Sequence, residues 1–209
     1  DTYAMKIYRM YPTSINERYL DEIAEILRQG GIVVYPTDTL YAIGCNALNA
    51  RAVARVCEIR DINPAKRPLS IVCSDISQAS EYARIDNRAF GILRRNLPGP
   101  FTFILPASPH LTRTFKGRKE VGVRIPDNEI ARNIAGRLGN PILSSTATWP
   151  GADPEELFHP EELQMHYSHL VDAFVDGGNA PDNATPSAII DLSDSSEPIV
   201  VREGPLPLQ

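Results

Sequence analysis

Apolar positions recur along the chain with two spacings, and together they predict an alternation of strands and helices. Residues 16–29 and 50–60 carry apolar side chains at helical spacing, and Asn16 can cap the first of these helices. Further helices are expected within 74–83, 88–97, 129–138 and 160–169. Short apolar runs rich in β-branched residues predict strands. These are expected at 6–8, 32–35, 69–73, 101–105, 121–126, 141–143, 171–175, 187–191 and 199–202.

The segment 30–73 predicts how the rest of the chain is organised. Its pattern is strand, crossover helix and strand, which is the unit that builds parallel or mixed sheets. The polar cluster Thr37–Thr39 follows the first strand, and the cations Arg60, Lys66 and Arg67 gather before the second. Ligands of such sheets bind at the carboxyl ends of the strands. We therefore expect a substrate pocket that binds an anion.

Composition and charge narrow the class of protein. The chain has 209 residues, of which 43% are hydrophobic and 22% charged, so we expect an ordinary soluble fold with one domain over residues 1–209. The net charge of −5 disfavours non-specific nucleic-acid binding but permits a local basic pocket. No apolar run approaches the ~20 residues of a membrane span, and residues 1–10 lack a signal-peptide core. Three cysteines without a C-x-x-C pair fit a reduced, cytoplasmic setting.

Several polar side chains stand in or beside the predicted strands. Arg124 lies within an apolar strand, where burial is unfavourable unless the guanidinium has an anionic partner, so it is a ligand candidate. Arg202 is another cation at the end of a strand. The hydroxyl cluster 144–148 is either a loop or helix cap, or a set of donors for phosphates. Thr102 is either an ordinary strand residue or a pocket hydroxyl.

Other polar patterns have simpler interpretations. The basic run 116–119 is more typical of a solvated loop than of a phosphate or RNA contact. Glu162, His166 and His169 follow one helix face, but a solvated face is favoured over a metal site because no H-E-x-x-H pattern is present. The sequence also contains no P-loop, G-x-G-x-x-G or G-x-S-x-G motif, so no conventional nucleotide fold is indicated.

Six motifs in order resemble the YrdC-like family over roughly residues 24–204: PTDTLYAIGCNA, PGPFTFIL, VGVRIP, the Ser/Thr cluster after PIL, SAIIDL and VVREG. The resemblance implies an α/β fold, a single-domain twisted mixed β-sheet with flanking helices and a basic concave cleft. It also implies a nucleotidyltransferase that forms L-threonylcarbamoyladenylate from L-threonine, bicarbonate and ATP and releases pyrophosphate. That product feeds the threonylcarbamoyl modification of an adenosine beside the tRNA anticodon.

The resemblance assigns roles to individual positions. It implies catalytic cations at Arg60, Lys66, Arg67 and Arg124. It implies substrate binding by Thr37, Tyr41, Thr102 and Ser187. It implies nucleotide binding by Ser145, Thr146, Thr148 and Arg202. ATP is expected to enter with Mg²⁺ as a substrate complex, without a tightly held metal site in the protein.

Four family motifs are altered in this chain, and the changes are similar to those of the YciO branch. K-x-R has become Arg60-Asp61-Ile62-Asn63 with a shifted Lys66-Arg67, and S-x-N has become Thr146-Ala147-Thr148. S-T-I-I-D has become SAIID, and R-P-G has become REG. The altered K-x-R and S-x-N positions motivate one alternative, a YciO-type protein that binds tRNA, other RNA or ribosomes through the cleft without catalysis. A further alternative is a protein that binds or hydrolyses nucleotides and acts on a different acyl-adenylate.

The implied reaction suits the cations. A carbamate oxygen attacks the α-phosphate, and negative charge develops on phosphate oxygens and on the departing pyrophosphate, where guanidinium groups bind well. A carbamate is already anionic, so no general base is required. The central expectation is that Thr37, Arg60, Arg124, Thr146 and Arg202 share one hollow.

Overall fold

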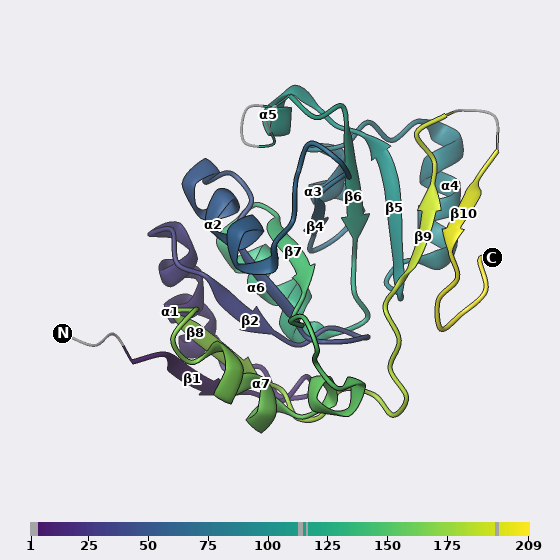
Figure 1. Cartoon of the computed structure of the whole chain (residues 1–209). Coiled ribbons are helices and arrows are strands. Elements are labelled where there is room, and N and C mark those ends of the chain that lie inside the picture. Colours follow the sequence, from purple (N-terminus) through teal and green to yellow (C-terminus); the bar gives the residue numbers. More distant parts are fainter. Residues whose placement is uncertain (1–3, 113–114, 116, 195–196) are drawn as a thin grey trace.

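One mixed sheet organises the chain. The structure, a computed structural model, describes residues 4–112, 115, 117–194 and 197–209; Lys116 of the basic run therefore lies outside the described residues. The strands are β1 (Lys6–Arg9), β2 (Val33–Tyr35), β3 (Ala42–Asn46), β4 (Ser70–Val72), β5 (Phe101–Pro106), β6 (Glu120–Arg124), β7 (Ile142–Thr146), β8 (Ala173–Asp176), β9 (Ala188–Asp191) and β10 (Ile199–Arg202). They lie in the order β1-β8-β2-β3-β7-β4-β6-β5-β9-β10, with parallel and antiparallel pairs (Figure 1). The expected mixed α/β fold is confirmed.

Helices flank the sheet where helical periodicity predicted them. They are α1 (Glu17–Arg28), α2 (Ala50–Arg60), α3 (Ile76–Ser80), α4 (Asn87–Asn96), α5 (Pro109–Thr112), α6 (Glu129–Leu138), the 3₁₀ helix η1 (Pro154–Phe158) and α7 (Pro160–Tyr167). Asn16 caps α1 by accepting from Tyr19 N at 3.0 Å, as predicted. The short α5 and η1 were not among the expected helices, since neither has enough residues to show a period. Within the described part of the chain, no helix is long and apolar enough to span a membrane.

The two faces of the sheet bury separate cores. Val33 packs with Leu20 and Ile130 in a cluster beneath α1 and α6. Its neighbour Val34 packs instead with Val53 in a larger cluster that includes residues of α2, α4 and α7. Adjacent strand residues point to opposite faces, so each strand contributes to both clusters.

The expected strand-helix-strand unit over 30–73 is corrected by the structure. A further strand, β3, follows β2 and pairs antiparallel with both β2 and β7. β7 in turn pairs antiparallel with β4. β2 and β4 are therefore separated by two strands and run in opposite directions. β3 was missed because its sequence AIGCN is short and contains a glycine, which strands disfavour. That glycine is required, because a Cβ at Gly44 would lie 2.0 Å from Leu143 O.

The twist of the sheet brings together strand ends that are distant in the strand order. In Figure 1, β2 runs across the view and β6 runs down it, and the segments that follow them converge. Asp127 N, after β6, donates to Asp38 Oδ2, after β2, at 2.9 Å. Asn128 Nδ2 donates to Thr37 O at 3.3 Å. Twist accumulates from strand to strand, so the ends of strands far apart in the sheet order can approach one another.

Candidate functional site

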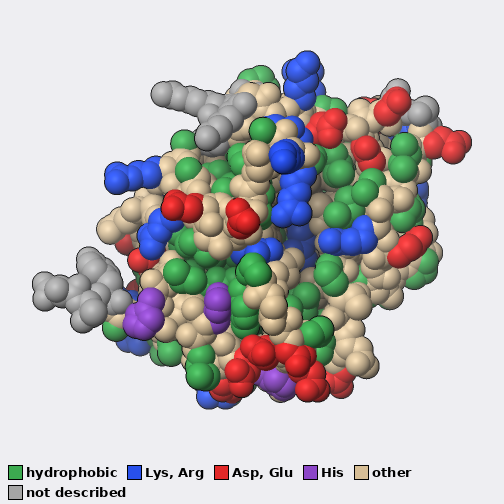
Figure 2. Space-filling view, viewed as in Figure 1, with side chains coloured by type: hydrophobic (Ala, Val, Ile, Leu, Met, Phe, Trp, Pro, Cys, Tyr) green, Lys and Arg blue, Asp and Glu red, His purple; other side chains and the backbone are tan. Residues whose placement is uncertain are grey.

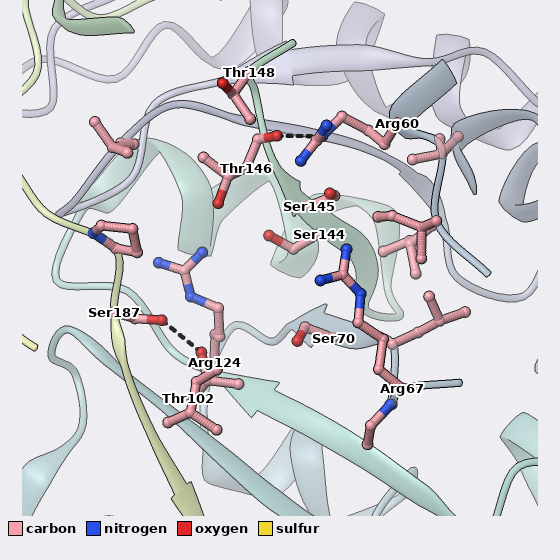
Figure 3. A pocket seen from close by; sticks show the side chains of 18 of the residues that line it. Arg60, Arg67, Ser70, Thr102, Arg124, Ser144, Ser145, Thr146, Thr148 and Ser187 are labelled. Atoms are coloured by element: carbon pink, nitrogen blue, oxygen red, sulfur yellow. Dashed lines mark hydrogen bonds between the residues drawn. The ribbon is translucent and has the colours of Figure 1, made fainter. Parts of the chain in front are cut away.

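A cavity of about 430 Å³ lies over the middle of the sheet and is lined by four arginines, Arg60, Arg67, Arg124 and Arg202. This volume is typical of small-molecule sites. None of the described residues that line the cavity is acidic. Figure 2 shows Lys and Arg side chains running down the middle of this face. In Figure 3 the guanidinium groups of Arg60, Arg67 and Arg124 point toward the middle of the cavity from different sides.

The register of the strands places hydroxyl groups beside Arg124. Ser70 pairs with Ser144 on one side and with Gly122 on the other, and Arg124 pairs with Thr102. Residues two apart on a strand share a face, so these side chains all project from the same face. Gly122 keeps the floor open, because a Cβ there would lie 2.6 Å from Ser70 Oγ and 2.9 Å from Thr102 Cγ2.

Arg124 is buried with few acceptors. It is 7% exposed, and Nη2 donates to Thr39 Oγ1 at 3.2 Å. Asp38 Oδ1 lies 3.9 Å from Nη2, while Arg124 Nε has no hydrogen-bond partner in the described chain. Burial raises the pKa of Asp38, against the lowering effects of the Asp127 amide and of Arg124. A buried guanidinium with this few acceptors is stabilised by an added anion.

Arg60 and Arg202 are held by backbone carbonyls. Arg60 Nε donates to Thr146 O at 2.6 Å. Arg202 donates to Ser187 O through Nε at 2.9 Å and Nη2 at 2.6 Å. A carbonyl fixes the position of a guanidinium without neutralising it, so both side chains retain their full charge for a ligand.

The arginines are close enough to repel one another. Burial lowers the pKa of Arg202, and the charges of Arg124 and Arg67 lower it further. Burial also lowers the pKa of Arg60, where the nearby Tyr167 opposes the shift and Arg67 adds to it. Mutual repulsion among these cations, which share a cavity whose described lining contains no carboxylate, is relieved when a polyanion binds.

Hydroxyl groups complete the lining. Thr102 Oγ1 and Ser187 Oγ are 2.7 Å apart and share a hydrogen bond (Figure 3). Ser144 Oγ is buried and finds no partner among the residues that the structure describes. Thr148 lies at the cavity edge, and its carbonyl accepts from the Tyr167 hydroxyl at 2.7 Å. The cavity therefore offers both guanidinium and hydroxyl donors.

The structure brings most of the predicted residues into this cavity. The predicted residues that line it are Arg60, Arg67, Thr102, Arg124, Ser145, Thr146, Thr148, Ser187 and Arg202. Lys66 is exposed and does not line it. Ser145 and Thr146 were expected to follow the strand but belong to β7 itself. This extension was missed because serine and threonine clusters are common in loops.

Thr37 and Tyr41 lie elsewhere: both line a second cavity, of about 530 Å³. The expected single hollow therefore does not include Thr37. Its hydroxyl donates to Leu40 O at 2.7 Å and lies 3.2 Å from Thr39 Oγ1, which in turn holds Arg124. The Tyr41 hydroxyl donates to Gly178 O at 2.6 Å and accepts from Gly177 N at 3.0 Å.

Sequence reasoning overlooked four residues near Arg124. Ser70 and Ser144 line the cavity, and Asp38 and Thr39 contact Arg124. Ser144 belonged to the predicted hydroxyl cluster 144–148 but was given no role of its own. Ser70 lies in a strand whose pairing joins distant segments, so nothing local marks it. Asp38 and Thr39 were visible as a polar cluster, but their partner is more than 80 residues away.

No metal-binding group accompanies the cavity among the described residues: no cluster of three or more His, Cys, Asp or Glu side chains could hold a metal ion. On the predicted helix face, His166 stacks on Trp149 with ring centroids 3.9 Å apart. That ring contact gives His166 a packing role.

Comparisons with known proteins agree on the family. The Sua5/YciO/YrdC family model, described as "Telomere recombination", matches residues 25–204. YciO of Escherichia coli K12 is 36% identical over 201 residues, covering 95% of each chain. The crystal structure of E. coli YciO superposes with a TM-score of 0.88 at 34% identity and 98% coverage of both chains. P. abyssi Sua5 in complex with L-threonine superposes with a TM-score of 0.85 at 30% identity, covering 98% of this chain and 58% of that one.

Proposed function

The chain belongs to the Sua5/YciO/YrdC family, and from this premise we propose that it forms L-threonylcarbamoyladenylate from L-threonine, bicarbonate and ATP. The observation that carries the proposal is the buried Arg124, which has an unpartnered Nε and lies in a cavity lined by three further arginines and no described carboxylate. Such a site favours a ligand with several negative charges. The triphosphate of ATP, entering with Mg²⁺ as the substrate complex, has this character.

The four arginines would divide the charge of the reaction. A carbamate oxygen of N-carboxythreonine attacks the α-phosphorus, and the bond from that phosphorus to the oxygen bridging to the β-phosphate breaks. The electron pair leaves on pyrophosphate. Arg60, Arg67, Arg124 and Arg202 would stabilise the charge that develops on the phosphate oxygens. Because the carbamate is already an anion, rate acceleration would come from positioning and electrostatics.

The hydroxyl groups would orient a small amino acid. P. abyssi Sua5 has been solved with L-threonine, and this chain shares its fold at 30% identity. The bonded pair Thr102 and Ser187, together with Ser144, offers both donors and acceptors to an amino acid and its side-chain hydroxyl. Thr37 would act indirectly, through Thr39, on the position of Arg124.

Pyrophosphate release tests the proposal. Wild-type protein with Mg²⁺ and ATP should release pyrophosphate only when L-threonine and bicarbonate are both present. Omission of either one, and replacement of threonine by valine, are the controls. Failure to release pyrophosphate with the complete mixture would contradict the proposed reaction. Release with another amino acid alone would indicate a different acyl-adenylate.

A further inference from the structure

Tyr35 does not line the cavity, but its ring packs beside Gly44, the strand partner of the lining residue Ser144. Tyr35 ends β2, is fully buried, and belongs to the apolar cluster under α1 and α6. Its hydroxyl has no hydrogen-bond partner among the described residues, and the same holds for Ser144 Oγ and Arg124 Nε. Unpartnered buried polar atoms are unfavourable and uncommon, so a group of them beside a cavity requires an explanation.

The route from Tyr35 to Ser144 crosses β3 at a glycine. Val33 of β2 pairs with Gly44 of β3, and Gly44 pairs with Ser144 of β7. A Cβ added at Gly44 would lie 3.1 Å from Tyr35 Cε1, so the tyrosine ring occupies the space that a side chain at this position would need. The missing side chain therefore lets the ring extend across β3 toward β7.

The electrostatics of Tyr35 are consistent with this placement. Burial raises the pKa of its phenol to about 12, while the Ser144 hydroxyl and the charge of Arg124 act in the opposite direction. The phenol therefore stays protonated at physiological pH and is available as a donor. A serine hydroxyl has one proton to donate and two lone pairs to accept with.

We propose that Tyr35 is a positioning residue for the cavity, and that its hydroxyl donates to Ser144 Oγ when an anion binds beside Arg124. That bond occupies a lone pair on the buried side of Ser144 and directs the serine O–H into the cavity. The anion receives one more donor, and two buried hydroxyls are satisfied together. This inference refines how the proposed ATP site holds its ligand.

Tyr8 provides a matched control within the same cluster. It is 5% exposed, and its hydroxyl also lacks a partner in the described part of the chain. Its ring packs edge-on against Tyr19, with centroids 5.3 Å apart, and Tyr8 does not line the arginine cavity. Removing either hydroxyl changes the same apolar layer, but of the two rings it is that of Tyr35 that packs at Gly44, the strand partner of Ser144.

Calorimetric titration with Mg²⁺-ATP distinguishes the two tyrosines. Tyr35→Phe should weaken binding about fivefold, the effect of roughly one hydrogen bond, while Tyr8→Phe should bind like the wild type. Thermal unfolding of both variants should stay close to that of the wild type. Equal affinity of Tyr35→Phe and the wild type would overturn the inference.

A double-mutant cycle tests whether Tyr35 acts through Ser144. Tyr35→Phe should cause no further loss of affinity in a Ser144→Ala background; additive losses would overturn the proposed route. The readout is binding, so absence of pyrophosphate release would defeat the proposed reaction but not this inference. Absence of ATP binding by the wild type would defeat both.

Discussion

Two groups of arginines in this molecule have opposite environments. On the surface between α1 and α6, Arg137 donates to Asp21 at 2.5 Å and to the Glu17 carboxylate. Nearby, Arg132 pairs with Asp127 at 3.6 Å and also contacts Glu129. In the cavity, Arg60 and Arg202 donate to backbone carbonyls. Arg124 donates to the Thr39 hydroxyl at 3.2 Å, and the Asp38 carboxylate lies 3.9 Å away.

The surface arginines form ion pairs with carboxylates, as Arg137 does between α6 and α1. Arg60 and Arg202 in the cavity donate to carbonyls instead, which leaves their charge available to a ligand. Exposed ion pairs contribute little to stability, because water and salt screen them. A buried cation without a close anionic partner, such as Arg124, lowers stability instead. Its retention in a cavity lined by three further arginines is therefore explained by binding.

The largest expected effect is that of Arg124→Ala. It removes the most buried cation of the cavity, so the rate of pyrophosphate release should fall about 100-fold or more. Arg124→Lys should restore only part of the rate, because an ammonium lacks the planar fork of a guanidinium. Arg137→Ala is the matched control and should leave the rate unchanged. Equal losses in both variants would remove the distinction between the two groups.

Two neighbouring cations allow a finer test. Arg67 lines the cavity, whereas Lys66 does not. Arg67→Ala should weaken Mg²⁺-ATP binding about tenfold, the effect of one charge-assisted contact, and Lys66→Ala should leave it nearly unchanged. A larger loss for Lys66→Ala would mean that the ligand lies outside the described cavity.

A smaller effect is expected from Asp38, the carboxylate nearest Arg124. Its folded pKa lies above the ordinary value, mainly through burial, so the folded state binds the proton more tightly than the unfolded state. Stability should then fall as the pH rises through the interval above 3.8. Asp38→Asn should raise the unfolding midpoint at pH 7, and the gain should shrink toward pH 4. A gain that grows as the pH falls would contradict the assigned cause.

The smallest expected effect is on stability at the α1–α6 surface. Arg137→Ala should lower the thermal unfolding midpoint only slightly, and less in high salt than in low salt, because its ion pairs are exposed. A large, salt-independent drop would show that this surface group supports the fold more than its exposure suggests.

The sequence predicted the chemistry of the site better than its geometry. Arg124 was recognisable because a cation in an apolar strand demands a partner, and the hydroxyls of Thr102 and Ser187 matched family motifs. Ser144 belonged to the predicted hydroxyl cluster, but its place in the cavity was not recognisable, because that place depends on the pairing of β7 with β3 and β4. Such pairings join distant segments, and no local period encodes them.

Thr37 illustrates the same limit. Its position after β2 was predicted correctly, but the side of the 37–39 segment that it faces depends on the twist of the sheet. The twist places Asp127 against Asp38, so that Thr39 meets Arg124 while Thr37 faces the second cavity. Sequence motifs identified the segment but not the direction of each side chain.

Calorimetric titration of Mg²⁺-ATP into wild type and Arg124→Ala tests the central claim most directly. The account predicts one site in the wild type, an affinity that weakens as salt is raised, and loss of measurable binding in a variant that still folds. Unchanged, salt-independent ATP binding by folded Arg124→Ala would contradict it.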